Sequence, residues 1–250
     1  MMGLQVKKLR IGEGVPKICV PVTGVSREEI LEQSGSIARS GPDLVEWRCD
    51  YYRDILKEGC CLRMLELLSD VFKEIPILFT FRSSMEGGNC EISPEAYETL
   101  NLAAADQGIA DLIDVEVYRD GLDAKGLIKK IHQRRGKVVA SNHHFDTTPS
   151  VEDMTKLMKG MENMDGDILK LAVMPQEPKD VLNLLLATSQ VSAGTVRPVV
   201  TMSMGNLGTL SRISGGTFGS AITFASVGEP SAPGQISLDD IRMIFSLLHK

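Results

Sequence analysis

The sequence predicts an α/β protein, a (β/α)8 TIM barrel whose single domain spans residues 1–250. Apolar, β-rich runs alternate with longer segments of helical periodicity along the whole chain. A length of 250 residues is also usual for such a barrel. A doubly wound open sheet is the alternative, but no glycine-rich fingerprint follows the first apolar run.

Eight apolar runs are expected to form the barrel strands, because strands buried on both faces are apolar almost throughout. Residues 1–12 precede the first of them, and we expect this N-terminal extension to close the bottom of the barrel. The strands are predicted at 16–21, 43–49, 76–82, 111–118, 137–143, 167–173, 197–203 and 221–226.

Helices are expected between the strands, and several segments begin with residues that are typical of helix starts. Ser26 is a candidate N-cap, and Pro94 and Pro149 stand where proline suits a first turn. The clearest helical segments are 27–40, 93–108, 150–164 and 178–190, and 237–249 is expected to be the closing helix.

Composition argues against several classes of protein. The formal net charge is −6 and the isoelectric point is about 5.3, so we expect no nucleic-acid partner, which would normally meet a basic face. No run of about 18 apolar residues could span a membrane, and residues 1–10 lack the apolar core of a signal peptide. The five cysteines lack metal-site spacing, so we expect reduced thiols, no bound metal and a cytoplasmic protein.

Polar and ionisable residues share one parity in five of the expected strands. Side chains alternate between the two faces of a strand, so residues two apart point the same way. In four of these strands the other parity is large and apolar and must face the helices, so the polar parity should point inward. These inward residues are Glu46, Arg48, Thr80, Arg82, Asp114, Glu116, Ser141, His143 and Lys170.

Such a cluster has two explanations. It could be a buried ion-pair network that serves only as scaffolding, with acidic side chains neutralising Arg82 and Lys170. Hydrophobic residues fill barrel cores at lower cost, however, because buried ion pairs rarely offset their own desolvation. We therefore expect a polar ligand to bind at the mouth of the barrel, where barrel active sites are built.

Lys170 is the lone charge inside the apolar run 168–173. Burying an unpaired ammonium group is costly, and a lowered pKa is the usual relief. The neutral amine that results can form an imine with a ketone or an aldehyde. The alternative is a lysine that is ion-paired with a nearby carboxylate.

Several blocks of the chain resemble type I 3-dehydroquinate dehydratase, the imine-forming enzyme of the shikimate pathway and hence of aromatic amino-acid biosynthesis. The resemblance runs from about residue 16 to the C-terminus, with the blocks in the family's order and spacing. Each block alone is a weak signal, whereas all of them in register are a strong one. The blocks are DLVEWRCD (43–50), FTFR (79–82) with EGG (86–88), DLIDVE (111–116), VVASNH (138–143), LKLAVMP (169–175), TMSM (201–204), SR (211–212) and SAPGQ (231–235).

The resemblance implies a mechanism that needs no cofactor and no metal. Lys170 would form a protonated imine with the ring ketone of 3-dehydroquinate, which acidifies the neighbouring C–H. His143 would remove that proton and then protonate the departing hydroxyl, and its near-neutral pKa suits both roles. Glu86 would orient the imidazole. Hydrolysis of the imine would then release 3-dehydroshikimate.

The resemblance also implies how the substrate is held. Arg212 would pair with its carboxylate, because a guanidinium can donate two parallel hydrogen bonds. Ring hydroxyls would meet Glu46, Arg48 and Arg82, and Ser231 and Gln235 would belong to a lid that excludes water. Trp47, in the same motif as Glu46, is also assigned to substrate binding. A homodimer is expected for the family.

Two positions depart from the family pattern. His144 follows the histidine where an acidic or amide residue is common, and Pro21 stands where some members have a serine that contacts the substrate. Strand parity turns His144 toward the helix layer or the rim. Pro21 has no side-chain donor, so one minor contact is expected to be lost.

Three other functions remain open from the sequence. A class I aldolase or transaldolase would also use an inward lysine, but it would not need the neighbouring histidine as a dehydrating acid. A metal-dependent lyase could use His143 and His144, although successive strand positions point to opposite faces. A ligand-binding relative without activity is the third, and the intact set of Glu86, His143 and Lys170 argues against it.

Overall fold

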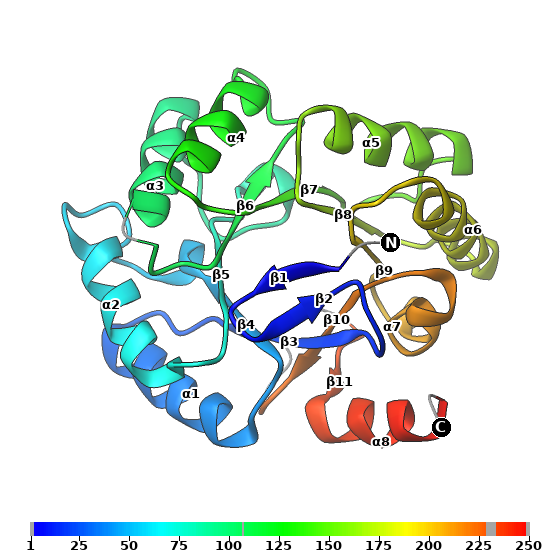
Figure 1. Ribbon diagram of the computed structural model, residues 1–250, viewed down its shortest axis with the longest axis horizontal. Helices are drawn as coiled ribbons and strands as arrows, with labels where there is room; N and C mark the ends of the chain where they lie inside the picture. The colour runs from blue at the N-terminus through cyan, green and yellow to red at the C-terminus, as the bar shows by residue number, and fades with distance from the viewer. Residues whose placement is uncertain (1–2, 107, 229–233, 249–250) are drawn as a thin grey trace.

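The computed structural model describes residues 3–106, 108–228 and 234–248. A curled parallel sheet forms a barrel inside a ring of helices (Figure 1), which confirms the predicted fold. Each strand pairs with the next, and the sheet closes where the backbone N–H of Ala221 donates to the carbonyl of Val199 at 2.7 Å. The barrel strands are β3 (Lys17–Val22), β4 (Leu44–Arg48), β5 (Ile77–Thr80), β6 (Leu112–Glu116), β7 (Val138–His144), β8 (Ile168–Val173), β9 (Val199–Ser203) and β10 (Ile222–Ser226).

The helices form the outer layer, and several of them begin where the local sequence provides a cap. The Ser26 side chain accepts a hydrogen bond from the backbone N–H of Glu29, whose own side chain reaches back to complete a capping box. Ser150 caps the helix that follows β7 in the same way, through the N–H of Asp153. The helices are α1 (Arg27–Ser40), α2 (Cys60–Phe72), α3 (Pro94–Asp106), α4 (Ala124–Gln133), α5 (Val151–Asn163), α6 (Pro178–Gly194), α7 (Thr209–Ser214) and α8 (Leu238–Leu248).

A hairpin lies across the end of the barrel where the strands begin, as Figure 1 shows. Its strands β1 (Leu4–Val6) and β2 (Leu9–Ile11) are antiparallel. Val6 and Ile11 are buried in the apolar cluster that fills the lower barrel, together with Leu44 and Leu78. The hairpin therefore shields the lower core from water and leaves the opposite end for a ligand.

Strand alternation divides the buried residues into two sets. The larger apolar cluster lies between the sheet and the helices and includes Phe79, Phe81 and Tyr97, and Phe81 meets Tyr97 edge-to-face. The polar parity of the same strands points into the barrel, where Arg82, Asp114 and other ionisable residues are buried. The predicted division into apolar and polar faces is confirmed.

Three aspartates directly before strands fasten the lower end of the barrel. Each carboxylate accepts a hydrogen bond from the backbone N–H of a residue near the start of the preceding strand, which adds a bond at the bottom of each strand pair. Asp43 binds Ile18 at 2.7 Å, Asp111 binds Ile77 at 2.8 Å and Asp167 binds Val138 at 2.8 Å.

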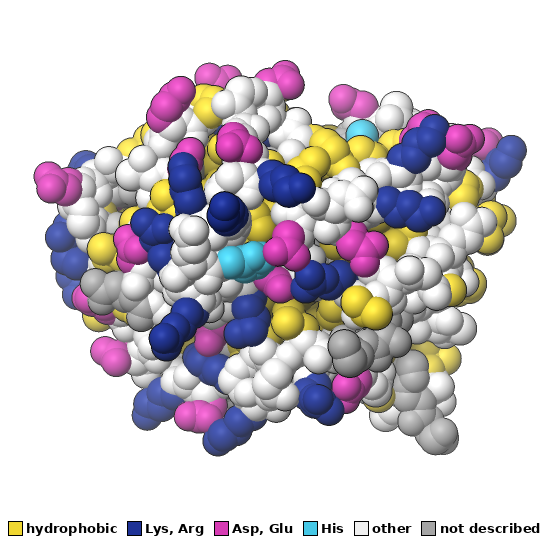
Figure 2. Space-filling model, turned by 45° about the horizontal axis from the view of Figure 1, so that its top comes forward, with side chains coloured by type: hydrophobic (Ala, Val, Ile, Leu, Met, Phe, Trp, Pro, Cys, Tyr) yellow, Lys and Arg dark blue, Asp and Glu magenta, His cyan; other side chains and the backbone are white. Residues whose placement is uncertain are grey.

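The chain ends with a short strand and a helix on the outside of the barrel. Strand β11 (Ile236–Ser237) pairs with the end of β10, and α8 follows directly. In the described residues, no helix has the length and apolar character needed to cross a membrane. On the face seen in Figure 2, acidic and basic side chains are interspersed, with a histidine among them.

Candidate active site

A pocket of about 520 Å³, part of it open to solvent, lies at the C-terminal end of the barrel strands, within the size range of small-molecule sites. It contains most of the residues that the sequence singled out, brought together from β4, β7, β8, α7 and the segments after β5 and before β11. Its lining consists of Glu46, Arg48, Arg82, Glu86, Gly87, His143, Phe145, Lys170, Ala172, Met202, Met204, Arg212, Phe224 and Gln235.

Lys170 lies between two carboxylates at one level of the barrel. Its ammonium donates to Glu46 Oε1 at 3.1 Å and to Asp114 Oδ2 at 3.3 Å, and it stands 4.8 Å from the ring centre of Phe224. Glu46, Asp114 and Lys170 each stand three residues after one of the fastening aspartates, so alternate strands deliver them to the same inward layer. The ion pairing that the sequence left as an alternative for Lys170 is therefore present.

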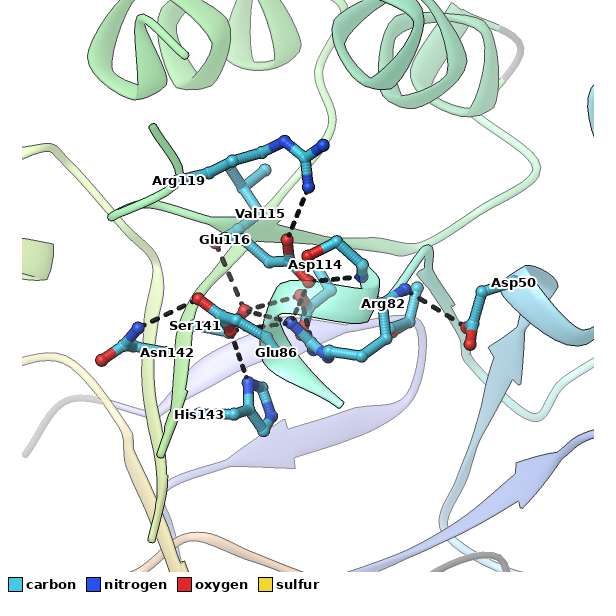
Figure 3. Close-up of polar contacts among 12 residues, drawn as sticks. Asp50, Arg82, Glu86, Asp114, Val115, Glu116, Arg119, Ser141, Asn142 and His143 are labelled. Atoms are coloured by element: carbon cyan, nitrogen blue, oxygen red, sulfur yellow. Dashed lines mark hydrogen bonds and ion pairs between the residues drawn. The ribbon is translucent and has the colours of Figure 1, made fainter. Parts of the chain in front are cut away.

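Arg82 is the centre of a buried network (Figure 3). Its guanidinium donates to Asp114 at 2.8 Å, Glu116 at 3.0 Å, Ser141 at 3.1 Å and Glu86 at 3.3 Å. Burial alone would lower the pKa of Arg82, but the three carboxylates raise it well above its ordinary value. Arg82 therefore stays cationic and holds the carboxylates in place.

Asp114 belongs to both parts of this site, because it binds Arg82 and Lys170. Burial acts to raise the pKa of Asp114, but the two cations and the Ser141 hydroxyl lower it below the usual value. The Ser141 hydroxyl donates to Asp114 at 2.6 Å. The ionised Asp114 thus provides a fixed negative charge beside the lysine.

His143 and Glu86 form a hydrogen-bonded pair with Nδ1 and Oε2 2.8 Å apart, and Asn142 Nδ2 donates to the other oxygen of Glu86 at 3.0 Å. Burial, with Glu116 nearby, raises the pKa of Glu86 to about 8 despite the attraction of Arg82. Burial and the neighbouring cations Arg82 and Lys170 lower the pKa of His143 well below its ordinary value. Of the two groups, Glu86 therefore holds a proton more readily than His143 does.

Two further arginines face the pocket. Arg48 is held by Asp50 through two hydrogen bonds of 2.8 Å each. Arg212 lies on α7 and is 3% exposed, and burial lowers its pKa to about 10, so it is still cationic at neutral pH. Thr223 of β10 donates to the Arg212 carbonyl at 2.9 Å, which ties this turn of α7 to the barrel.

The side chain of Trp47 does not line the pocket. Its side chain packs between the sheet and the helices, with ring-centre distances of 5.7 Å to Phe79 and 6.4 Å to Tyr52. The reason is strand alternation, because Glu46 and Arg48 point inward and the residue between them must point outward. The Trp47 side chain therefore lies outside the pocket lining, and the substrate binding assigned to Trp47 stays a prediction that its backbone would have to fulfil. Ser231 lies outside the described residues.

The sequence prediction missed the apolar wall of the pocket, which includes Ala172, Met202 and Met204. The alternation of Met202, Ser203 and Met204 at the end of β9 and directly after it is the signal that could have revealed this wall. Phe145 was also missed. Its ring lies so close to Gly87, which has φ +77°, that an added Cβ there would come within 2.2 Å of the ring, so glycine is required under Phe145.

The positions that depart from the family pattern are both near the pocket. Pro21 lies in β3 opposite Glu46. Strand β7 pairs with β8 residue for residue from Val139 to His144, without a bulge. His143 lines the pocket and His144 does not, as alternation requires. No three His, Cys, Asp or Glu side chains of the described residues are grouped as a metal site would need.

We expect His144→Asn to retain most of the activity, within about threefold, because surface or rim substitutions usually have small effects. His144 is half-buried, and burial lowers its pKa. Because the side chain lies outside the pocket lining, any effect of the substitution should be on thermal stability. His143→Asn is the matched comparison and should be severely impaired. A steady-state assay of both variants checks this, and the reverse order of activities would contradict the assignment.

Comparison with known proteins places these features in one family. A family model described as type I 3-dehydroquinase matches residues 18–250. The chain is 43% identical to a 3-dehydroquinate dehydratase from Listeria welshimeri over 245 residues, 98% of this chain and 97% of that protein. It is 41% identical to one from Klebsiella pneumoniae over 244 residues, 97% of each chain.

Solved structures agree with the sequence comparisons. A type I 3-dehydroquinate dehydratase from Clostridium difficile, with covalent modified comenic acid, superposes with a TM-score of 0.95 at 40% identity, covering 100% of this chain and 99% of that chain. A 3-dehydroquinate dehydratase from Geobacillus kaustophilus also has a TM-score of 0.95, at 38% identity, covering 98% and 96%. Together with the buried lysine and histidine in the barrel mouth, these matches show that the chain belongs to the type I 3-dehydroquinase family.

Proposed function

We propose that this chain dehydrates 3-dehydroquinate to 3-dehydroshikimate through an imine at Lys170, with His143 as general base and general acid. The observation that carries the proposal is that Lys170, the His143–Glu86 pair and Arg212 all line one pocket. The ketone, the acidic C–H and the carboxylate of one small ring can then contact Lys170, His143 and Arg212 at the same time. The names of the relatives and the covalently modified ligand in the Clostridium difficile structure support the same chemistry.

The first step is imine formation at Lys170. The ammonium must lose a proton, and the carboxylates of Glu46 and Asp114 at 3.1 and 3.3 Å are the nearest acceptors. The amine then attacks the ketone carbon, and water leaves to give a protonated imine. The proton taken up by a carboxylate returns to the departing hydroxyl, which leaves as water. The imine is again a cation at the same place, so both carboxylates regain an ionic partner at the end of the step.

The second step is removal and return of a proton by His143. When Nδ1–H donates to the ionised Glu86, the lone pair of Nε2 is free to accept a proton from the carbon next to the imine. The electrons of that C–H bond move onto the imine nitrogen. They return to expel the hydroxyl, which leaves as water with the proton from His143, and hydrolysis of the imine regenerates Lys170.

Different charged groups around the pocket are assigned to different parts of the substrate. Arg82 already donates to four acceptors, so its main role is to hold the carboxylates. Glu46 and Arg48 are then the better candidates for contacts with ring hydroxyls. Arg212 is the cation we assign to the substrate carboxylate, and Gln235 lines the same pocket as a further candidate for a substrate contact.

Arg212→Ala should raise the Michaelis constant by about ten- to a hundredfold, because a charge-assisted bidentate contact is typically worth ~1.5–3 kcal/mol. Gln235→Ala is the comparison and should have a smaller effect. Steady-state kinetics on both variants make the test. An unchanged Michaelis constant in the Arg212 variant would transfer the carboxylate role to another residue.

The proton held by Glu86 beside His143 predicts a pH profile. Glu86, with its pKa raised to about 8, keeps a proton below that pH, and the neutral carboxyl then donates to Nδ1, which leaves the hydrogen on Nε2 and blocks the base. We expect kcat/KM to rise with pH through about 8. In Glu86→Gln this rise should disappear from the range around pH 8, because an amide does not titrate. A profile unchanged by the substitution would exclude Glu86 as the titrating group.

The test of the proposed reaction is direct. Purified protein is incubated with 3-dehydroquinate, and formation of the conjugated enone is followed by absorbance, with and without a chelator. We expect turnover that the chelator does not affect. Opening of the ring at a C–C bond, to give an acyclic dicarbonyl compound, would indicate an aldolase. Loss of turnover with chelator would indicate a metal-dependent lyase, and binding without turnover would indicate an inactive relative.

A further inference from the structure

We infer that Asp50 is a positioning residue for the proposed reaction, and that its single carboxylate sets both the Arg48 guanidinium and the loop that carries Glu86. The inference rests on the proposed function. Asp50 follows β4 in a 3₁₀ turn, Cys49–Tyr51. It is 2% exposed and does not line the pocket itself.

Four donors surround the carboxylate, two on each oxygen. Oδ1 accepts from Arg48 Nε at 2.8 Å and from the backbone N–H of Arg82 at 3.2 Å. Oδ2 accepts from Arg48 Nη2 at 2.8 Å and from the backbone N–H of Asn89 at 3.1 Å. A carboxylate has about four such acceptor positions, so all of them are used.

The two backbone contacts bracket one loop. Arg82 stands at its start and Asn89 near its end, with Glu86 in a 3₁₀ turn between them. The loop is also tied to itself, because Gly88 N–H donates to the Ser83 carbonyl at 2.7 Å. An added Cβ at Gly88 would come within 1.8 Å of the Arg82 carbonyl oxygen, so the loop is tightly closed. Asp50 therefore holds both ends of the segment that presents Glu86 to His143.

The same carboxylate fixes the direction of Arg48. A fork of two parallel hydrogen bonds sets the plane of the guanidinium, and the remaining N–H groups are left for a ligand. Asp50 thus couples the placement of a substrate-binding cation to the placement of the proton-transfer pair. Errors of about 1 Å in such placement can cost on the order of a hundredfold in rate.

Asp50→Asn is the test variant, because it keeps the size of the side chain and replaces one acceptor oxygen by a donor. That NH₂ group would face one N–H of Arg48 and one backbone N–H. Because donors repel donors, the contacts at that position of the side chain must be lost. We expect the Michaelis constant to rise about tenfold through Arg48 and kcat to fall about tenfold through Glu86. The rise of kcat/KM near pH 8 should also move, because Glu86 changes its surroundings.

Asp167→Asn is the matched control at the opposite end of the barrel. The Asp167 carboxylate likewise accepts from an arginine, Arg197 at 3.3 Å, and from a strand N–H, that of Val138 at 2.8 Å. Both variants should lower the melting temperature. Only the Asp50 variant should change the Michaelis constant, kcat and the pH profile by more than about twofold, since a merely structural effect would move stability alone.

A double-mutant cycle with Arg48→Met separates the two routes. If Asp50 acts on substrate binding through Arg48, Asp50→Asn should raise the Michaelis constant much less in the Arg48→Met background. Kinetic constants of the Asp50 variant within twofold of wild type, or equal to those of the Asp167 control, would overturn the inference. Each comparison is a ratio of kinetic constants to those of wild type, measured by enone formation. The test of Asp50 therefore does not depend on trapping an imine. If wild type gave no trapped imine, the Lys170 proposal would fail, but the conclusion about Asp50 would be unchanged.

Discussion

Lys170→Met should lower kcat by at least about 10⁴-fold, the scale of loss seen when a covalent nucleophile is removed. The thioether cannot condense with a ketone, so neither imine nor enone can form by the proposed route. The substitution also removes the cation that lies 3.1 Å from Glu46 and 3.3 Å from Asp114. Binding of the substrate carboxylate at Arg212 should persist, which equilibrium binding can check.

Lys170→Arg is the control that separates charge from nucleophilicity. Its guanidinium keeps a positive charge between the two carboxylates but stays protonated at any pH of interest. We therefore expect the arginine variant to be as inactive as the methionine variant and better folded. Near-normal turnover by either variant would show that the imine mechanism is wrong.

His143→Ala should lower kcat by about 10²–10⁴-fold, the usual contribution of a general acid or base. The Lys170 amine is unchanged, so the imine should still form while its conversion stalls. Reduction by borohydride should then trap the enzyme in a variant that makes little product. If the variant neither traps nor binds the substrate, His143 is a structural residue and its assigned role fails.

Much of the site could be predicted because strand alternation is a simple rule. The parity of Glu46, Asp114 and Lys170 predicted a shared inward face, and the structure brings these three side chains into contact. The same rule places the Trp47 side chain on the outer face of β4, and the structure shows it there, among the apolar residues between the sheet and the helices. The motif that grouped Trp47 with Glu46 and Arg48 did not distinguish the two faces. His144 also follows it, because β7 runs to its end without a bulge.

Contacts between loops could not be predicted in this way. The hydrogen bonds from Asp50 to the backbone of Arg82 and Asn89 depend on how the segment 82–89 closes on itself. No periodicity in the sequence predicts that closure. Phe145 enters the pocket only because Gly87 leaves room beneath its ring. The ion pairs of Lys170 depend on three strands far apart in the sequence, so parity alone could not decide between a paired and an unpaired lysine.

The most direct test of the account is reduction of the enzyme with borohydride in the presence of 3-dehydroquinate, followed by peptide mass analysis. The account predicts a stable mass increment on the peptide that contains Lys170, dependent on substrate and absent from Lys170→Met. An active enzyme that acquires no increment, or acquires it on a different lysine, would contradict the central claim that Lys170 forms the imine.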